Sequence, residues 1–134
     1  MRKFLQEKKV LDISGFQINQ KFLPQIKNGD KRVFIIGGII KGAIKRIPKK
    51  GSIVSNIGQG GKAVKTTLTK NEYRIAKKVA TNLKKKHIIF AGIDLISNYL
   101  TGDINITSPT GLKNFKDLTG VNLAVDFWNF LEKR

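Results

Sequence analysis

Residues 93–111 decide the fold of this 134-residue chain and read IDLISNYLTGDINITSPTG. Apolar and polar side chains alternate on both sides of a polar turn at residues 97–99, which is typical of two antiparallel strands. Lysines are frequent elsewhere but absent from this stretch, where carboxylates, an amide and small hydroxyl residues replace them. Hard oxygen donors of this kind are the ligands that Mg²⁺ prefers. The stretch therefore predicts a hairpin that carries a cation site beside a substrate pocket.

Four oxygen-bearing side chains of this hairpin are candidates for one site. Strand alternation places Asp103, Asn105 and Thr107 on one face, and Asp94 on the preceding strand can face the same side. Two carboxylates and an amide oxygen suit Mg²⁺, which keeps waters and takes its other ligands from nucleotide phosphates. The alternative is that Asp94 and Asp103 are unrelated polar residues near a turn.

The strand register decides whether the two carboxylates meet. If residues 97–99 form the turn, Asp94 lies opposite Gly102, and Asp103 faces the wrong side of the sheet. One extra residue in the second strand corrects this, and glycine suits a bulge because it tolerates positive φ. We therefore expect a bulge at Gly102.

Composition narrows the class of protein. A chain of this length with 40% hydrophobic residues can bury the core of one domain. The absence of cysteine excludes disulfides and thiol chemistry, and a single histidine, His87, argues against a Ser-His-Asp triad or a histidine metal site. No apolar run is long enough to span a membrane, and residues 1–9 contain no signal-peptide core. We expect a cytoplasmic protein without a membrane partner.

The formal net charge of +17 raises the question of a polyanionic partner. The basic residues are mostly lysines scattered along the chain, and neither interleaved aromatics nor a nucleic-acid-binding motif is visible. A solvated lysine-rich surface that also attracts small anionic ligands is therefore favoured. A non-catalytic basic protein of the same fold that binds nucleic acid is the alternative.

Hydrophobic periodicity predicts an α+β fold with a largely antiparallel sheet and flanking helices. The clearest helix follows a capping box that Thr69 and Glu72 form. We expect helices at residues 1–9, 70–86, 112–118 and 122–131, strands at 16–23, 32–36, 39–47, 88–96 and 99–107, and an irregular glycine-rich functional loop at 49–65.

Two arginines stand in strands otherwise built of isoleucine and valine. Arg32 and Arg46 each need a partner there, either within the fold or as a carboxylate or phosphate of a ligand. Arginine is rare in this lysine-rich chain, which favours the ligand. The loop at Gly58, Gly60 and Gly61 can cradle an anion or simply be flexible.

Four segments together resemble, in order, the C-terminal half of bacterial glutathione synthetase, an ATP-grasp ligase. They are QKFLP at 20–24 with NGDKRV at 28–33, KRIP at 45–48, AGID at 91–94 and INITSPTG at 104–111. Asn56 and the Gly60-Gly61 pair also fall where that family has an asparagine and two glycines. The similarity runs from about Phe16 to the C-terminus.

The resemblance implies a fold and an activity. Residues 16–134 would form the C-terminal ATP-grasp subdomain, and residues 1–15 would be an N-terminal helix and lead-in. The family joins γ-glutamylcysteine to glycine, using ATP and Mg²⁺ or Mn²⁺ to form an acyl phosphate that the glycine amine attacks. The chain would begin within the domain, so a separate chain carrying the N-terminal half is an expected partner, and the isolated chain is expected to be inactive.

The resemblance also assigns roles to individual residues. The catalytic arginines are Arg46, at the reacting phosphoryl and acyl groups, and Arg32, at the peptide substrate. The nucleotide positions are Gln20, Lys21, Phe22, Leu23 and Asp30. The metal ligands are Asp94, Asp103 and Asn105, and the substrate positions are Arg32, Asn56, Gly60, Gly61, Asn105, Ser108 and Thr110.

The chain departs from the family pattern at its second metal ligand. The family has a glutamate there, whereas Asp103 is one methylene shorter and follows an apparent insertion of Gly102. Lys21 stands where an asparagine is common. Another ATP-grasp ligase with a different acyl substrate is a third possibility, against which the pocket at residues 107–111 argues.

Overall fold

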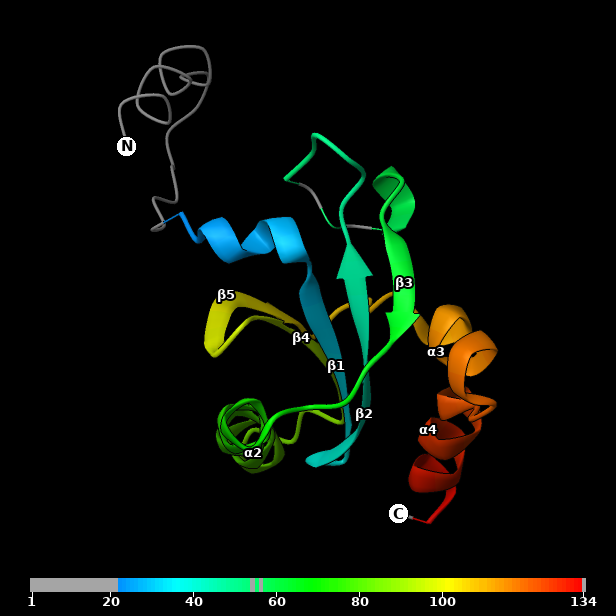
Figure 1. The fold of residues 1–134 in the computed structure, drawn as a ribbon. Coiled ribbons are helices and arrows are strands. Elements are labelled where there is room, and N and C mark those ends of the chain that lie inside the picture. Colours follow the sequence, from blue (N-terminus) through cyan, green and yellow to red (C-terminus); the bar gives the residue numbers. More distant parts are fainter. Residues whose placement is uncertain (1–21, 54, 56, 134) are drawn as a thin grey trace, which may run out of the picture.

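The computed structural model describes residues 22–53, 55 and 57–133 (Figure 1). Its centre is a five-stranded sheet in the order β3-β2-β1-β4-β5, and every neighbouring pair is antiparallel. The strands are β1 (Asp30–Ile36), β2 (Ile39–Ile47), β3 (Lys62–Lys65), β4 (Phe90–Ile96) and β5 (Tyr99–Asn105). The predicted α+β fold with an antiparallel sheet and flanking helices is therefore confirmed.

Helix α2 (Lys70–Lys85) covers one face of the sheet (Figure 1). The capping box is present: Thr69 Oγ1 accepts from the Glu72 N–H at 3.2 Å, and Glu72 Oε2 accepts from the Thr69 N–H at 2.7 Å. The apolar side of the helix packs on a core of strand residues. The fully buried members of this core include Val33, Ile35 and Ile93 from the sheet and Ala76 and Ala80 from α2.

Helices α3 (Leu112–Thr119) and α4 (Leu123–Glu132) lie on the opposite face (Figure 1). Phe34 and Ile36 of β1 pack there against Phe115 and Leu123, and the Phe34 and Phe115 rings meet edge to face at 5.5 Å. Asp30 and Arg32 alternate onto this same face of β1. One face of the sheet thus carries an apolar core at one end of β1 and charged side chains at the other.

The β1–β2 hairpin turns at Gly37 and Gly38, whose φ angles of 60° and 78° suit a tight hairpin turn. The pairing is not regular along its length. Phe34 pairs with Gly42 but Ile35 pairs with Ile40, so one residue of β2, Lys41, is extra. This bulge changes which β2 side chains share a face with those of β1.

Several predictions on the type and bounds of the elements need correction. Residues 62–65 form strand β3 although they were expected in an irregular loop, because their backbone pairs with the outer edge of β2. The loop also contains a short 3-10 helix, η3 (Ile57–Gln59), and a second 3-10 helix, η2 (Pro24–Asn28), precedes β1. Strand β5 ends at Asn105, two residues before the expected end.

Other predictions fall largely outside the described residues. The expected helix at residues 1–9 lies entirely outside them. Of the expected strand at residues 16–23, only Phe22 and Leu23 are described, and neither is in a strand. Within the described part of the chain, no helix is long and apolar enough to cross a lipid bilayer.

Candidate functional site

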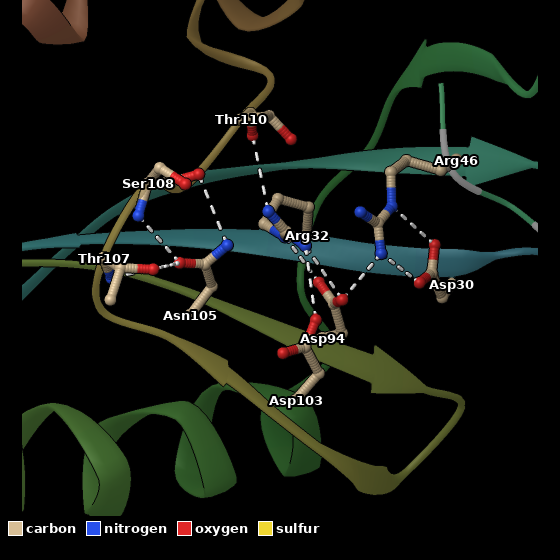
Figure 2. A network of polar contacts seen from close by, with 9 residues as sticks. All are labelled: Asp30, Arg32, Arg46, Asp94, Asp103, Asn105, Thr107, Ser108 and Thr110. Atoms are coloured by element: carbon tan, nitrogen blue, oxygen red, sulfur yellow. Dashed lines mark hydrogen bonds and ion pairs between the residues drawn. The ribbon is translucent and has the colours of Figure 1, made fainter. Parts of the chain in front are cut away.

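Five charged side chains form a line across four strands, on the α3–α4 face of the sheet (Figure 2). Arg46 lies on β2, Asp30 and Arg32 on β1, Asp94 on β4 and Asp103 on β5; we call them the charged row. The strand register explains the arrangement, because Asp30 pairs with Arg46 and Arg32 pairs with Asp94. All are buried except Asp103, whose side chain is 59% exposed.

Each arginine of the charged row forms a two-pronged contact with one carboxylate. Arg32 donates from Nε to Asp94 Oδ1 at 2.5 Å and from Nη2 to Oδ2 at 2.9 Å. Arg46 donates from Nε to Asp30 Oδ1 at 2.9 Å and from Nη2 to Asp30 Oδ2. Arg46 Nη2 also lies 2.8 Å from Asp94 Oδ2. Asp94 therefore joins the two arginines. Both arginines are paired within the fold, whereas the sequence favoured a ligand as their partner.

The pKa values of the two carboxylates at the β5 end of the row are shifted in opposite directions. Burial pushes the pKa of Asp94 up, but the hydrogen bonds from Arg32 and the charges of both arginines outweigh burial and lower it. The pKa of Asp103 is raised, first by its side-chain hydrogen bond with Asp94 and then by burial and by repulsion from that carboxylate. Burial alone would lower the pKa of Arg46, but Asp30 and Asp94 raise it. Asp94 is thus a firmly ionised centre beside a partly exposed second acid.

The β4–β5 register brings Asp103 to this position. Leu95 pairs with Leu100 and Ile93 pairs with Ile104, so three residues of β5, 101–103, lie opposite Asp94. Regular pairing allows one, and two residues are therefore extra. The predicted irregularity at Gly102 is confirmed, but its size is wrong, because the turn takes only residues 97 and 98. Asp94 and Asp103 are in contact, which excludes the alternative of two unrelated polar residues.

Asn105 organises the loop that follows β5 (Figure 2). Its Oδ1 accepts from the Thr107 N–H at 3.1 Å, the Ser108 N–H at 3.0 Å and Thr107 Oγ1 at 3.3 Å, and its Nδ2 donates to the Ser108 carbonyl at 3.3 Å. Further along the loop, the Thr110 carbonyl accepts from Arg32 Nη1 at 3.5 Å. The sequence-predicted Ser108 and Thr110 are thereby held beside the charged row.

The donors present fit a hard cation in part. Asp94 and Asp103 offer two adjacent carboxylates, one of them open to solvent. Asn105 Oδ1 already accepts three hydrogen bonds, so it could ligate a metal only after the loop rearranges. Among the described residues, no group of three or more acidic, histidine or cysteine side chains could hold a metal. The two carboxylates would therefore supply only part of the coordination of a hard cation such as Mg²⁺.

The remaining predicted positions belong to the nucleotide and peptide sets. Gln20, Lys21 and Asn56 lie outside the described residues. Leu23 has extended backbone ahead of η2, and the side chain of Phe22 is 47% exposed. Gly60 and Gly61 lie between η3 and β3, in the segment that leads to Ala63, the cross-strand partner of Arg46.

The contact between Asp30 and Arg46 was not predicted from the sequence, which placed Asp30 among the nucleotide positions. A regular hairpin turning at residues 37–38 would set Asp30 opposite Lys45, and Arg46 would face α2. The extra residue Lys41 moves Arg46 opposite Asp30 instead. Gly42, next to Lys41, is the signal that could have indicated a bulge in β2.

The sequence matches the model of the prokaryotic glutathione synthetase ATP-grasp domain over residues 3–120. Similar proteins named glutathione synthetase include that of Rhodopseudomonas palustris, 38% identical over 115 residues, or 86% of this chain and 36% of the relative. The one from Prochlorococcus marinus is 43% identical over 105 residues, or 78% of this chain and 34% of the relative. The chain thus spans about a third of the length of these relatives. With most of its residues matched, and with the predicted antiparallel fold, the chain belongs to the family of the prokaryotic glutathione synthetase ATP-grasp domain.

Proposed function

We propose that this chain provides metal, nucleotide and peptide contacts of a cytoplasmic ATP-dependent ligase that joins γ-glutamylcysteine to glycine through an acyl phosphate. The observation that carries the proposal is the charged row, in which the ionised Asp94 contacts both arginines and the partly exposed Asp103. Family membership supports the reaction class and the names of the relatives support the substrates.

The acidic end of the row is the proposed cation site. Asp94 and Asp103 would hold Mg²⁺ or Mn²⁺, and Asn105 would join them only after releasing its loop. The metal, when bound, neutralises phosphate charge as a Lewis acid. Asp94 is kept ionised by Arg32 and Arg46, so its ligand form is present at neutral pH.

The two arginines are the proposed electrostatic groups. Arg46 is buried between Asp30 and Asp94 and its pKa is raised, so it stays cationic where phosphoryl and acyl charge would develop. Arg32 reaches the Thr110 carbonyl of the loop and would hold a carboxylate of the peptide. Both are fixed in advance, which avoids reorganisation during the reaction.

The remaining contacts complete the proposal. The adenine would lie against Phe22 and Leu23, with Gln20 and Lys21 preceding them, and Asp30 would lie near the ribose or phosphates. The peptide positions are Asn56, Gly60, Gly61, Asn105, Ser108 and Thr110. The other two thirds of the ligase would come from the same polypeptide or from a partner chain.

The test uses ADP release with γ-glutamylcysteine, glycine and Mg-ATP. The 134-residue chain alone should release no ADP, whereas the chain joined to the unmatched part of the Prochlorococcus marinus enzyme should release ADP only with both amino substrates present. Asp94→Asn should abolish release from the joined protein, and Lys113→Ala, in an exposed pair with Asp117, should not. Turnover by the isolated chain, or a folded joined protein without ADP release, would contradict the proposal.

A further inference from the structure

Gly92 occupies a position where a side chain normally stabilises the strand. It lies in the middle of β4, is buried, and pairs with Phe34 on β1 and Asn105 on β5. Its φ is not in the left-handed region, so the backbone does not require glycine there. A glycine inside a central strand costs stability, and it often marks a close approach by another group.

Two groups from the site approach Gly92. A Cβ atom built on it would lie 2.9 Å from Arg32 Cδ and 3.3 Å from Arg32 Nη1. The same atom would lie 3.1 Å from Pro109 Cβ, in the loop between Ser108 and Thr110. Arg32 and Pro109 are both buried. The bare backbone of Gly92 is therefore the surface on which the arginine side chain and the loop both rest.

We propose that Gly92 is a positioning residue that acts through Arg32 and Pro109. Without a side chain at position 92, the Arg32 guanidinium can lie across β4 and contact Asp94 and the Thr110 carbonyl at the same time. A methyl group there pushes Arg32 away from Asp94 and lifts the loop from the sheet. The consequence for peptide binding rests on the proposed function, in which Arg32 holds the peptide.

Gly42 provides a matched control in the same cross-strand line, because Phe34 pairs with Gly42 on one side and with Gly92 on the other. A Cβ on Gly42 would lie 2.6 Å from the Phe115 ring, in the apolar core. Gly42→Ala therefore strains the backbone, whose φ is 155° there, and disturbs apolar packing, while its new methyl group meets Phe115 rather than Arg32. Comparing Gly92→Ala with Gly42→Ala separates an effect on Arg32 from a general loss of stability.

The first experiment reads the Arg32 Nε–Hε cross-peak in ¹⁵N-labelled full chain by NMR, assigned through its loss in Arg32→Lys. Gly92→Ala should move this cross-peak by more than a linewidth, because the contact from Nε to Asp94 is altered. Gly42→Ala should leave it in place while lowering the midpoint of urea unfolding. An unmoved cross-peak in folded Gly92→Ala overturns the proposal.

The second experiment keeps the proposal testable if Gly92→Ala does not fold. Arg32→Ala removes the closest contact, so Gly92→Ala should lower the urea midpoint less in the Arg32→Ala background than in the wild type. Adding Pro109→Gly to the Arg32→Ala background removes the remaining close atom and should make the loss caused by Gly92→Ala smaller still. Equal losses in the wild type, in Arg32→Ala and in the double variant overturn the proposal.

The third experiment tests the consequence in the joined ligase. Gly92→Ala should raise KM for γ-glutamylcysteine by about tenfold and change KM for ATP much less, because only Arg32 and the loop are displaced. Equal changes in both KM values overturn the positioning role. If the joined protein has no activity but the Arg32 cross-peak moves as expected, the proposed function fails while the role of Gly92 in placing Arg32 stands.

Discussion

The hairpins β1–β2 and β4–β5 use different backbone irregularities to bring their charges together. In β2 one extra residue, Lys41, shifts the pairing and sets Arg46 opposite Asp30. In β5 two extra residues shift the pairing and set Asp103 beside Asp94. The two shifts differ in parity, and parity decides which face of a sheet a side chain takes.

An odd shift changes the face of every later side chain, whereas an even shift only slides it along the same face. If Lys41 joined the regular pairing, Arg46 and Ile44 would face α2, and Lys45 would lie opposite Asp30. If the two extra residues of β5 joined the regular pairing, Asp103 would still lie on the α3–α4 face. The first irregularity therefore builds both the core and the site, and the second adjusts the site alone.

Deleting Lys41 removes the need for the bulge in β2. Regular pairing from the turn at residues 37–38 then sets Gly42 opposite Phe34 and Arg46 opposite Asp30, as in the wild type, so the fully buried Ile44 stays in the core. The free energy of unfolding should change by less than about 1 kcal/mol. Circular dichroism with urea unfolding measures the change.

The matched control deletes residues 101 and 102 together. Because this even deletion returns β5 to regular pairing with Asp103 opposite Asp94, unfolding should change by less than about 1 kcal/mol. Deleting Gly102 alone should cost more than deleting both. A loss of several kcal/mol in the Lys41 deletion or in the double deletion would contradict this register argument.

Asp94→Asn should have the largest effect on stability, larger than that of Asp30→Asn. Loss of the Asp94 charge leaves Arg32 with Asp103, 3.6 Å away, as its carboxylate partner in the charged row, at a cost of about 3–5 kcal/mol. Asp30→Asn leaves Arg46 with Asp94 at 2.8 Å, so a loss of about 1.5–3 kcal/mol is expected. Urea unfolding at neutral pH measures both.

The pH dependence provides a second check on Asp94. Its folded pKa is lowered, so its contribution to stability is complete above the ordinary aspartate pKa and is lost as pH falls through the folded value. Wild-type stability should therefore fall on acidification more steeply than that of Asp94→Asn. Parallel pH profiles for the two proteins would contradict the assignment of this charge to the row.

The sequence predicted what depends on periodicity and composition. Alternation located the β4 and β5 strands, the Thr69 capping box located α2, and a glycine before Asp103 indicated an irregularity. The sequence did not predict the Asp30–Arg46 contact. One unpaired residue in β2, Lys41, changes the face on which Arg46 lies and leaves the local hydrophobic pattern almost unchanged. It also missed β3, since a four-residue edge strand beside glycines carries too short a pattern.

Glu72→Gln tests the α2 face and should have a smaller effect. Lys31, the neighbour of Arg32 in β1, points to the other face and contacts Glu72 Oε2 at 2.7 Å. Glutamine can still accept from the Thr69 N–H but loses this ion pair, so a cost of about 1 kcal/mol is expected. Urea unfolding measures it.

The pH dependence tests whether the charge of Glu72 causes the stability loss expected in Glu72→Gln. Burial raises its pKa, but hydrogen bonds from Lys31 and Thr69 outweigh burial and lower it. Its contribution is complete above the ordinary glutamate pKa and is lost as pH falls through the folded value. The difference between wild type and Glu72→Gln should therefore disappear in acid. Asp117→Asn, in an exposed pair with Lys113, should change stability by less than about 0.5 kcal/mol.

Asp103→Asn should have the smallest effect on stability, with the opposite sign. The folded pKa of Asp103 is raised, so folding favours the protonated carboxyl, and stability is lost as pH rises through that value. Removing the charge should stabilise the fold at neutral pH by less than about 0.5 kcal/mol, because the side chain is largely exposed and solvent screens it. In acid, where Asp103 is protonated, the variant and the wild type should unfold alike.

The same substitution should weaken Mg²⁺-dependent ATP binding in the joined ligase, measured by calorimetry, because it removes one of two proposed metal carboxylates. A residue whose charge disfavours the fold yet favours a ligand is expected at a functional site rather than in a structural ion pair. Asp94 differs, since its charge supports the fold and the proposed metal together. If Asp103→Asn lowers stability at neutral pH and leaves Mg-ATP binding unchanged, Asp103 belongs to the arginine network alone and the extra residues of β5 serve the fold.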